Sequence, residues 1–215
     1  MVKAQRVTAG DAEMLDPASP EWNGVRASQL TLQPTPITAQ PSQYIQEKWK
    51  ETPYGLARSV AVRAAHNGER LYFHLAWTDD TNDAGIHDTD QFADAAAILF
   101  PVNGDAPLQS MGSPQAPVNA WYWRPDLEAP LSVTAQGTGT TRRTQDPELS
   151  ASGMHDRGEW RVVIRRRLES PTADYVSIVP GVPSKVGFAL WQGANQERGG
   201  LKAASLDWEP LEIEA

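Results

Sequence analysis

Two alternating runs of residues flank an Asn-Gly pair, and together they constrain this chain more than any other feature. The runs cover residues 58–66 and 70–78, with Asn67 and Gly68 between them. Asn-Gly favours the type I′ turn of a β-hairpin, because both central residues of that turn need positive φ. One face of the second run carries Leu71, Phe73, Leu75 and Trp77. Side chains alternate along a strand, so this face is predicted to enter a core.

Other short apolar or alternating runs have the length and composition of β-strands. They lie at 95–101, 118–123, 131–137, 158–164, 185–192 and 208–213. Turn residues separate them, and convincing helices are almost absent. The pattern predicts an all-β fold, an antiparallel β-sandwich. The polar stretch 138–153 is expected to be a long loop.

Residues 1–57 contain recurrent prolines, which long helices and central strands do not accommodate. We expect an irregular segment here, with an edge strand at 29–32 and a short helix at 42–49. No repeat or linker divides the chain. Residues 1–215 are therefore predicted to form a single domain, with the segment 1–57 packed on it.

Composition disfavours several classes of protein. The net charge of −8 disfavours a nucleic-acid or anionic-membrane partner, since both attract basic surfaces. Cysteine is absent, which excludes disulfides, zinc thiolate sites, cysteine-held iron–sulfur clusters and covalent haem attachment. No apolar run is long enough to span a bilayer, and the N-terminus lacks the apolar segment of a signal peptide.

Local motifs do not indicate an enzyme. GxSxG and a cysteine nucleophile are both absent, so a self-contained hydrolase is disfavoured and no catalytic residue is expected. The acidic stretch 79–94 has oxygen ligands suited to calcium, but it lacks the EF-hand pattern, and a solvated turn is favoured. His66 is expected to be exposed at the hairpin turn. His74, on the face opposite Phe73, is interpreted as an ordinary strand residue, with haem ligation as the alternative.

Longer motifs in the second half of the chain resemble a known family. They comprise Met111-Gly112, PVNAWYW at 117–123, WQGANQER at 191–198 followed by Lys202, and AHNG at 65–68. Together they resemble the haem-binding γ subunit of ethylbenzene dehydrogenase. The same family includes γ subunits of dimethylsulfide dehydrogenase and of chlorate and selenate reductases.

The resemblance implies a β-sandwich related to carbohydrate-binding modules, with one non-covalent haem b in a pocket. Carried onto this sequence, it makes Met111 and Lys202 the two axial ligands of the haem iron. Trp121, Trp123 and Trp191 are then candidates for the pocket wall or for the core that supports it. A haem held without cysteine must be b-type, which agrees with the composition.

The resemblance also implies partners and a location. The γ subunit belongs to a heterotrimer with a molybdopterin-containing α subunit and an iron–sulfur β subunit. It passes electrons between the β subunit and an external acceptor such as a c-type cytochrome, in the periplasm. Without a signal peptide in this sequence, export together with a partner subunit is expected. The alternative is a carbohydrate- or ligand-binding sandwich module without haem, in which exposed tryptophans stack on sugars.

The two proposed axial ligands place different requirements on the site. A thioether is a soft ligand that favours ferrous iron and raises the reduction potential. Lysine ligates only as the neutral amine, and deprotonating it at pH 7 costs ~4.6 kcal/mol from its ordinary pKa of about 10.4. Burial reduces that cost by disfavouring the charged form.

Overall fold

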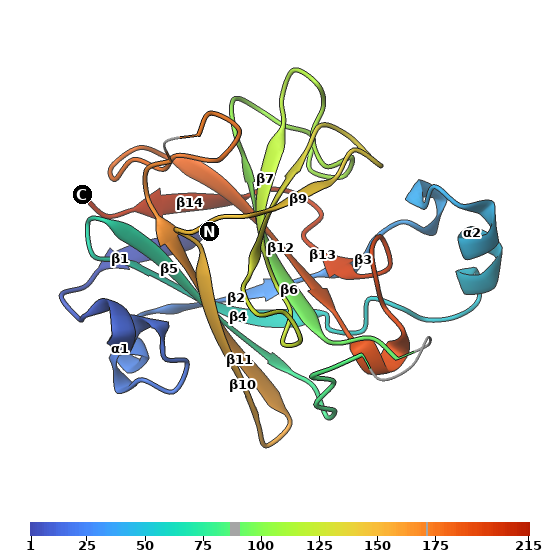
Figure 1. Ribbon diagram of the computed structural model, residues 1–215, viewed down its shortest axis with the longest axis horizontal. Coiled ribbons are helices and arrows are strands. Elements are labelled where there is room, and N and C mark those ends of the chain that lie inside the picture. Colours follow the sequence, from blue (N-terminus) through green and yellow to red (C-terminus); the bar gives the residue numbers. More distant parts are fainter. Residues whose placement is uncertain (87–90, 171) are drawn as a thin grey trace.

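The computed structural model describes residues 1–86, 91–170 and 172–215, which form a two-layered β-sandwich (Figure 1). The strands are β1 (Val2–Arg6), β2 (Ala27–Thr31), β3 (Gln33–Pro34), β4 (Ser59–His66), β5 (Arg70–Thr78), β6 (Ala95–Pro101), β7 (Val118–Trp123), β8 (Leu131–Ala135), β9 (Arg142–Gln145), β10 (Ser150–Asp156), β11 (Glu159–Arg167), β12 (Ser184–Trp191), β13 (Ala203–Ala204) and β14 (Glu209–Ile213). The helices are α1 (Asp11–Leu15) and α2 (Gln43–Trp49), and 3-10 turns occupy η1 (Pro20–Gly24), η2 (Ile37–Ala39) and η3 (Gly193–Asn195).

The two layers share one strand. The first layer has the order β10-β11-β5-β4-β1-β14, and the second has the order β12-β6-β7-β8-β9. Residues 184–186 of β12 pair with β14, whereas residues 187–191 pair with β6. At Gly187 the strand passes from one layer to the other, and a side chain there would meet Leu108 at 3.2 Å. This corner closes the sandwich.

The core between the layers is formed by alternate residues of the facing strands, as predicted. β5 contributes Leu71, Phe73, Leu75 and Trp77; β11 contributes Trp160, Val162 and Ile164; β6, β7 and β12 contribute Ile98, Phe100, Trp121, Trp123, Phe188 and Leu190. Phe73 makes edge contacts with both Trp121 and Phe188, with ring centroids 6.1 Å apart in each pair. The all-β sandwich expected from the alternation is therefore confirmed.

The hairpin of β4 and β5 is confirmed, but its turn differs from the predicted type. The Asn67 N–H bonds to the Arg70 carbonyl, so the central residues are Gly68 and Glu69 rather than Asn67 and Gly68. Only Gly68, with φ of 91°, has positive φ in this turn, which is the pattern of type II′. Asn67 instead accepts hydrogen bonds from the Glu69 and Arg70 N–H groups through its side chain.

Replacing Gly68 by Ala is expected to lower the free energy of unfolding by ~1–2 kcal/mol, because an L residue is strained at this φ. Urea unfolding followed by circular dichroism measures the change. Gly24→Ala is the matched control, since nothing lies within 4 Å of its added carbon and its φ is ordinary. Equal stability of both variants would contradict the strain.

The expectation that residues 1–57 are irregular is wrong at β1. This strand inserts between β4 and β14 and runs parallel to both, whereas all other strand pairs in the described ranges are antiparallel. β1 also covers His66, which is 1% exposed rather than exposed as predicted. The predicted edge strand and helix are found as β2 and α2, and the Ser42 hydroxyl caps α2.

The stretch 138–153 is not one long loop, as predicted, because it contains β9 and the start of β10. These two strands end the sheet path, and each has a single neighbour. Their composition is polar, so alternation of apolar residues gives no signal. Pairing with β8 and β11 determines these strands, and such partners are distant in sequence.

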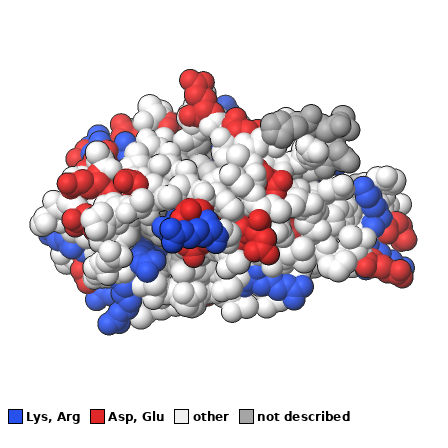
Figure 2. Space-filling view, turned by 90° about the horizontal axis from the view of Figure 1, so that it is seen from below, with Lys and Arg blue, Asp and Glu red and all other residues white. Residues whose placement is uncertain are grey.

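The surface carries both signs of charge. Figure 2 shows Lys and Arg interspersed with Asp and Glu over one face, with uncharged residues between them. No helix in the described parts of the chain is long and apolar enough to cross a membrane.

Candidate functional site

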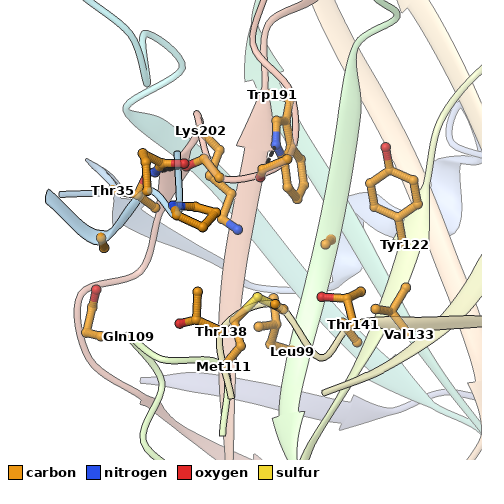
Figure 3. Close-up of a pocket in the computed structure, with 18 of the residues that line it drawn as sticks. Thr35, Leu99, Gln109, Met111, Tyr122, Val133, Thr138, Thr141, Trp191 and Lys202 are labelled. Atoms are coloured by element: carbon orange, nitrogen blue, oxygen red, sulfur yellow. Dashed lines mark hydrogen bonds between the residues drawn. The ribbon is translucent and has the colours of Figure 1, made fainter. Parts of the chain in front are cut away.

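A cavity of about 260 Å³ lies on the outer face of the second layer, away from the sandwich core (Figure 3). Its floor is a cross-strand row of Leu99, Ala120 and Val133, with Ala97 beside them. These residues alternate with the core residues of β6, β7 and β8. They are mostly small, and this leaves room above the sheet for a ligand.

The cavity continues into a wider opening beside α2, which we call the mouth. The mouth has a volume of about 570 Å³ and shares Gln40, Tyr122, Arg143, Trp191 and Gly200 with the cavity. Its size lies within the ~300–1,000 Å³ of typical small-molecule and cofactor sites.

Met111 enters the cavity from a tight loop. Its backbone has φ of 57°, a value that residues other than Gly, Asn and Asp seldom adopt. Three hydrogen bonds hold the loop: the Met111 N–H donates to Leu108 O, the Gly112 N–H to Pro107 O, and the Gly137 N–H to Met111 O. A left-handed residue costs on the order of 1–3 kcal/mol and persists only where its surroundings fix it. The loop therefore holds the Met111 side chain in a defined place.

Lys202 enters the same cavity from the opposite side, and Figure 3 shows its amine directed toward the space that holds the Met111 sulfur. Its carbonyl accepts the Thr35 N–H at 3.0 Å, which fixes the backbone. Its amine nitrogen lies 5.1 Å from the centre of the Trp191 ring. Among the described residues, no carboxylate forms a salt bridge with Lys202.

Burial lowers the pKa of the Lys202 amine from 10.5 to about 8. At pH 7 the cost of removing its proton falls to on the order of 1 kcal/mol, compared with ~4.6 kcal/mol in water. The site therefore prepares this lysine for a role in which it is neutral. A neutral amine and a thioether that face one space can together ligate a transition metal ion.

The loop that carries Lys202 is held by Glu197, a residue of the motif at 191–198 whose role the sequence alone does not indicate. This carboxylate is 1% exposed and accepts the N–H groups of Gly55 at 2.7 Å, Leu56 at 3.2 Å and Gln192 at 3.1 Å. The Asn195 amide donates a fourth bond at 3.0 Å. Glu197 therefore ties segment 192–202 to segment 55–56.

Gly200 fixes the same loop against the N-terminal segment. Its carbonyl accepts hydrogen bonds from the Thr35 hydroxyl and from the Gln40 amide. A side chain at Gly200 would place its first carbon 2.0 Å from the Gln40 Oε1 atom. Residues 35–41, predicted only as an irregular segment, thus form one wall of the cavity.

The three candidate tryptophans divide between the two faces of the second layer. Trp191 lines the cavity and donates its indole N–H to Gly199 O at 3.0 Å. Trp121 and Trp123 point into the sandwich core, so they belong to the support and not to the cavity wall. Between them in β7, Tyr122 points outward, lines the cavity and contacts Trp191 edge-on at 5.6 Å. Alternation along β7 places Tyr122 on the face opposite both tryptophans.

The alternative ligand, His74, lies outside the cavity. It is buried on the outer face of the first layer, where it packs on Trp22 at 5.1 Å and contacts Pro17 O at 3.2 Å. Burial lowers the pKa of His74, because it disfavours the charged imidazolium. These contacts support the interpretation as an ordinary strand residue.

The acidic connection is partly described. His87, Asp88 and Asp90, included in the prediction, lie outside the described residues. In the part that is described, no three acidic or histidine side chains are grouped to bind a metal ion. Asp83 and Asp94 instead accept N–H groups of η3, at Ala194 and Gly193. The solvated turn predicted here is thus tied to the loop that leads to Lys202, and Asp94 in it is fully buried.

Burial raises the pKa of Asp94 to about 6, against hydrogen bonds from Gly193, Trp160 and Asp83 that lower it. The folded protein therefore binds this proton up to about pH 6, whereas the unfolded chain releases it near pH 3.8.

The free energy of unfolding is expected to fall as pH rises from about 3.8 to about 6, by on the order of 3 kcal/mol. In Asp94→Asn this part of the pH dependence should disappear. Urea unfolding at pH 4 to 7 measures it, with exposed Asp207→Asn as control; parallel wild-type and Asp94→Asn curves would contradict the assignment.

The fold and the cavity define the class of protein: a β-sandwich of carbohydrate-binding-module shape with a ligand cavity on the outer face of one sheet. The structure matches a carbohydrate binding module family 9 from Caldicellulosiruptor kristjanssonii, solved with glucose, with a TM-score of 0.54. The match covers 99% of this chain and 95% of that chain at 9% identity. The same module with cellotriose gives a TM-score of 0.52 at 10% identity, covering 99% and 93%. At these identities the likeness concerns the fold alone.

Residues 19–150 and 144–203 match the family described as ethylbenzene dehydrogenase. The chain belongs to this family. It is 34% identical to chlorate reductase subunit gamma of Ideonella dechloratans over 98% of this chain and 84% of that protein. It is 38% identical to dimethylsulfide dehydrogenase subunit gamma of Rhodovulum sulfidophilum over 70% of this chain and 59% of that protein.

A third relative is named for a cofactor. The chain is 37% identical to "Putative respiratory nitrate reductase heme subunit ORF7" of Haloferax mediterranei, over 89% of this chain and 66% of that protein. The family expected from the motifs at 111–123 and 191–202 is thereby confirmed. Two of the three relatives are named as gamma subunits of oxidoreductases.

Proposed function

We propose that this chain is the haem b-binding, electron-transfer subunit of an oxidoreductase complex and has no catalytic activity of its own. One observation carries the proposal. The thioether of Met111 and the amine of Lys202 face one apolar-floored cavity, and no described carboxylate pairs with the amine. The relative named as a heme subunit supports haem as the cofactor that this cavity binds.

The residues of the cavity fit this cofactor. The amine of Lys202, with its lowered pKa, supplies a neutral nitrogen, and Met111 supplies a soft sulfur. The floor of Ala97, Leu99 and Ala120 offers an apolar surface against which the ring of the cofactor could pack. The chain has no cysteine, so attachment is non-covalent. When bound, haem supplies a centre that accepts and releases one electron.

The partners in this proposal follow the family. The relatives are gamma subunits of chlorate reductase and dimethylsulfide dehydrogenase, which supports a subunit role here. We infer an assembly with a molybdopterin-containing α subunit and an iron–sulfur β subunit in the periplasm. Met111 and Lys202 would hold the haem between the β subunit and an external acceptor such as a c-type cytochrome.

The proposal is tested by an absorption spectrum. The full chain, expressed with added haem precursor or titrated with haemin, should show a Soret band that saturates at one haem per chain. A pyridine haemochrome spectrum should identify b-type haem, removable by acid–ketone extraction. No Soret band above that of free haemin, after stoichiometric titration of folded protein, would reject the proposal.

The tryptophans count against the carbohydrate-binding alternative. All eight lie in described parts of the chain; seven are buried and Trp208 is half-buried, with its indole N–H bonded to Ala106 O at 2.7 Å. Sugar recognition by stacking needs an exposed aromatic face. The shared sandwich therefore does not favour sugar binding in this chain.

A further inference from the structure

The two ends of the cavity differ in charge. At the closed end, beyond Met111, a hollow of about 50 Å³ is lined mostly by apolar residues, which include Leu108, Phe188 and Ala189. Three neutral polar residues also line it, and Lys202 is the single charged residue among those described. Among the described residues, the mouth at the other end is lined by four cations, Lys48, Arg124, Arg143 and Arg198, and by one carboxylate, Glu197. A ligand that occupies the whole cavity therefore meets largely apolar walls at one end and several cationic side chains at the other.

Two charged residues of the mouth are already committed to other partners. Arg124 forms a two-bonded salt bridge with Asp126, and Glu197 accepts the backbone N–H groups described above. Arg143 and Arg198 form no salt bridge within the described residues. The guanidinium of Arg198 lies 4.3 Å from the centre of the Phe92 ring, and both residues line the mouth.

Arg143 is placed over the cavity by the sheet itself. In β9 it pairs with Val133, which pairs with Ala120 and then Leu99, so all four residues share the outer face in one row. Its neighbour Arg142 has the opposite orientation and does not line the cavity. Arg143 lines both the cavity and the mouth, so this residue lies where the two meet.

We propose that Arg143 and Arg198 bind the two propionate carboxylates of the haem, so that its propionate edge faces the mouth beside α2. This inference rests on the proposed function and adds the orientation of the cofactor. Burial of an unpaired carboxylate is costly, whereas guanidinium groups bind carboxylates by paired, charge-assisted hydrogen bonds. The vinyl and methyl edge then faces Leu108 and Phe188 at the closed end.

The test compares haemin with its dimethyl ester, in which the carboxylates are neutral. Both are titrated into the haem-free full chain, and affinity is read from the Soret band for wild type, Arg143→Gln, Arg198→Gln and the control Arg142→Gln. Arg143→Gln should weaken haemin binding about tenfold and leave ester binding unchanged. Arg198→Gln should act in the same direction, and Arg142→Gln should change neither.

The outcomes separate the inference from the function on which it rests. Equal weakening of haemin and ester would indicate a packing role for the arginines and overturn the inference. Unchanged haemin binding in both arginine variants would also overturn it, while haem binding itself stands. If neither haemin nor its ester binds the wild type, the proposed function fails first.

Discussion

Replacing Lys202 by Ala is expected to abolish the six-coordinate, low-spin spectrum of the haem-loaded protein and to weaken haem retention. Lys202→Arg should have the same spectral effect although it keeps a long cationic side chain, because a guanidinium cannot be deprotonated in a protein. Lys185→Ala, at an exposed lysine paired with Asp105, is the control. Absorption and electron paramagnetic resonance spectra measure the change, and a wild-type spectrum in Lys202→Arg would contradict ligation by the amine.

Ligation by Lys202 should also depend on pH in a defined direction. In the haem-free protein the Lys202 side chain loses its proton as pH rises through about 8. The fraction of neutral amine, which alone can ligate, therefore falls about tenfold for each pH unit below that value. Haem affinity should therefore rise with pH between 6 and 8. Affinity independent of pH in wild type, or the same dependence in Lys202→Ala, would contradict this role.

Replacing the other proposed ligand, Met111, is expected to change the reduction potential of the haem. Met111→Ala should lower the reduction potential by roughly 100 mV, a small part of the ~0.8 V range over which axial ligands set haem potentials. Loss of the thioether removes the ligand that favours ferrous iron. Met154→Ala, at a half-buried methionine of β10 outside the cavity, is the matched control. Equal potentials in the two variants would reject Met111 as a ligand.

The second large effect is expected at Glu197. Glu197→Ala should lower the free energy of unfolding by about 3 kcal/mol or more, because it leaves the buried N–H of Gly55 and that of Gln192 without their charged acceptor. For a chain of this size, that corresponds to a melting temperature lower by roughly 6–12 °C. Calorimetry of the haem-free protein measures it.

Two further variants separate the hydrogen bonds from the loss of a charge. Glu197→Gln keeps one acceptor oxygen but turns an amide N–H₂ toward N–H donors, so its loss of stability should be substantial but smaller. Glu212→Ala, at an exposed glutamate of β14, should change stability by less than ~0.5 kcal/mol. A melting temperature for Glu197→Ala within 2 °C of the Glu212→Ala value, a margin of roughly one-half kcal/mol, would contradict the stabilising role of the Glu197 hydrogen bonds. Because Glu197 holds the loop of Lys202, haem affinity should fall together with stability.

Much of the fold could be predicted because strand formation here follows a local pattern. Alternation predicts which residues of β5 and β11 enter the core, and Asn67-Gly68 locates the hairpin. The errors lie where pairing across the sheet outweighs the local signal. β1 is short and contains the polar residues Lys3, Gln5 and Arg6, and it becomes a strand by inserting between β4 and β14. β9 is polar throughout, and its pairing with β8 defines it.

The candidate site was predicted less completely. Met111, Lys202 and Trp191 were named from a family resemblance, and the structure places all three around one cavity. Tyr122 was overlooked because the neighbouring tryptophans dominate β7, although alternation already puts it on the other face. Glu197 lies in the motif at 191–198, but the sequence does not show that it binds the backbone of Gly55, or that the Gly200 carbonyl accepts from Gln40, because those partners are distant in sequence.

The sequence by itself determined the class of fold, the non-covalent nature of any haem and the family. These follow from side-chain period, from the absence of cysteine and from motifs in which neighbouring residues suffice. Tertiary structure alone decided that Met111 and Lys202 share a space, that Arg143 stands over it, and that the Lys202 amine lies in a setting that lowers its pKa. Each of these depends on strand register and on loops that meet from distant parts of the chain. Burial and the electrostatic field are properties of that assembly and not of any one segment.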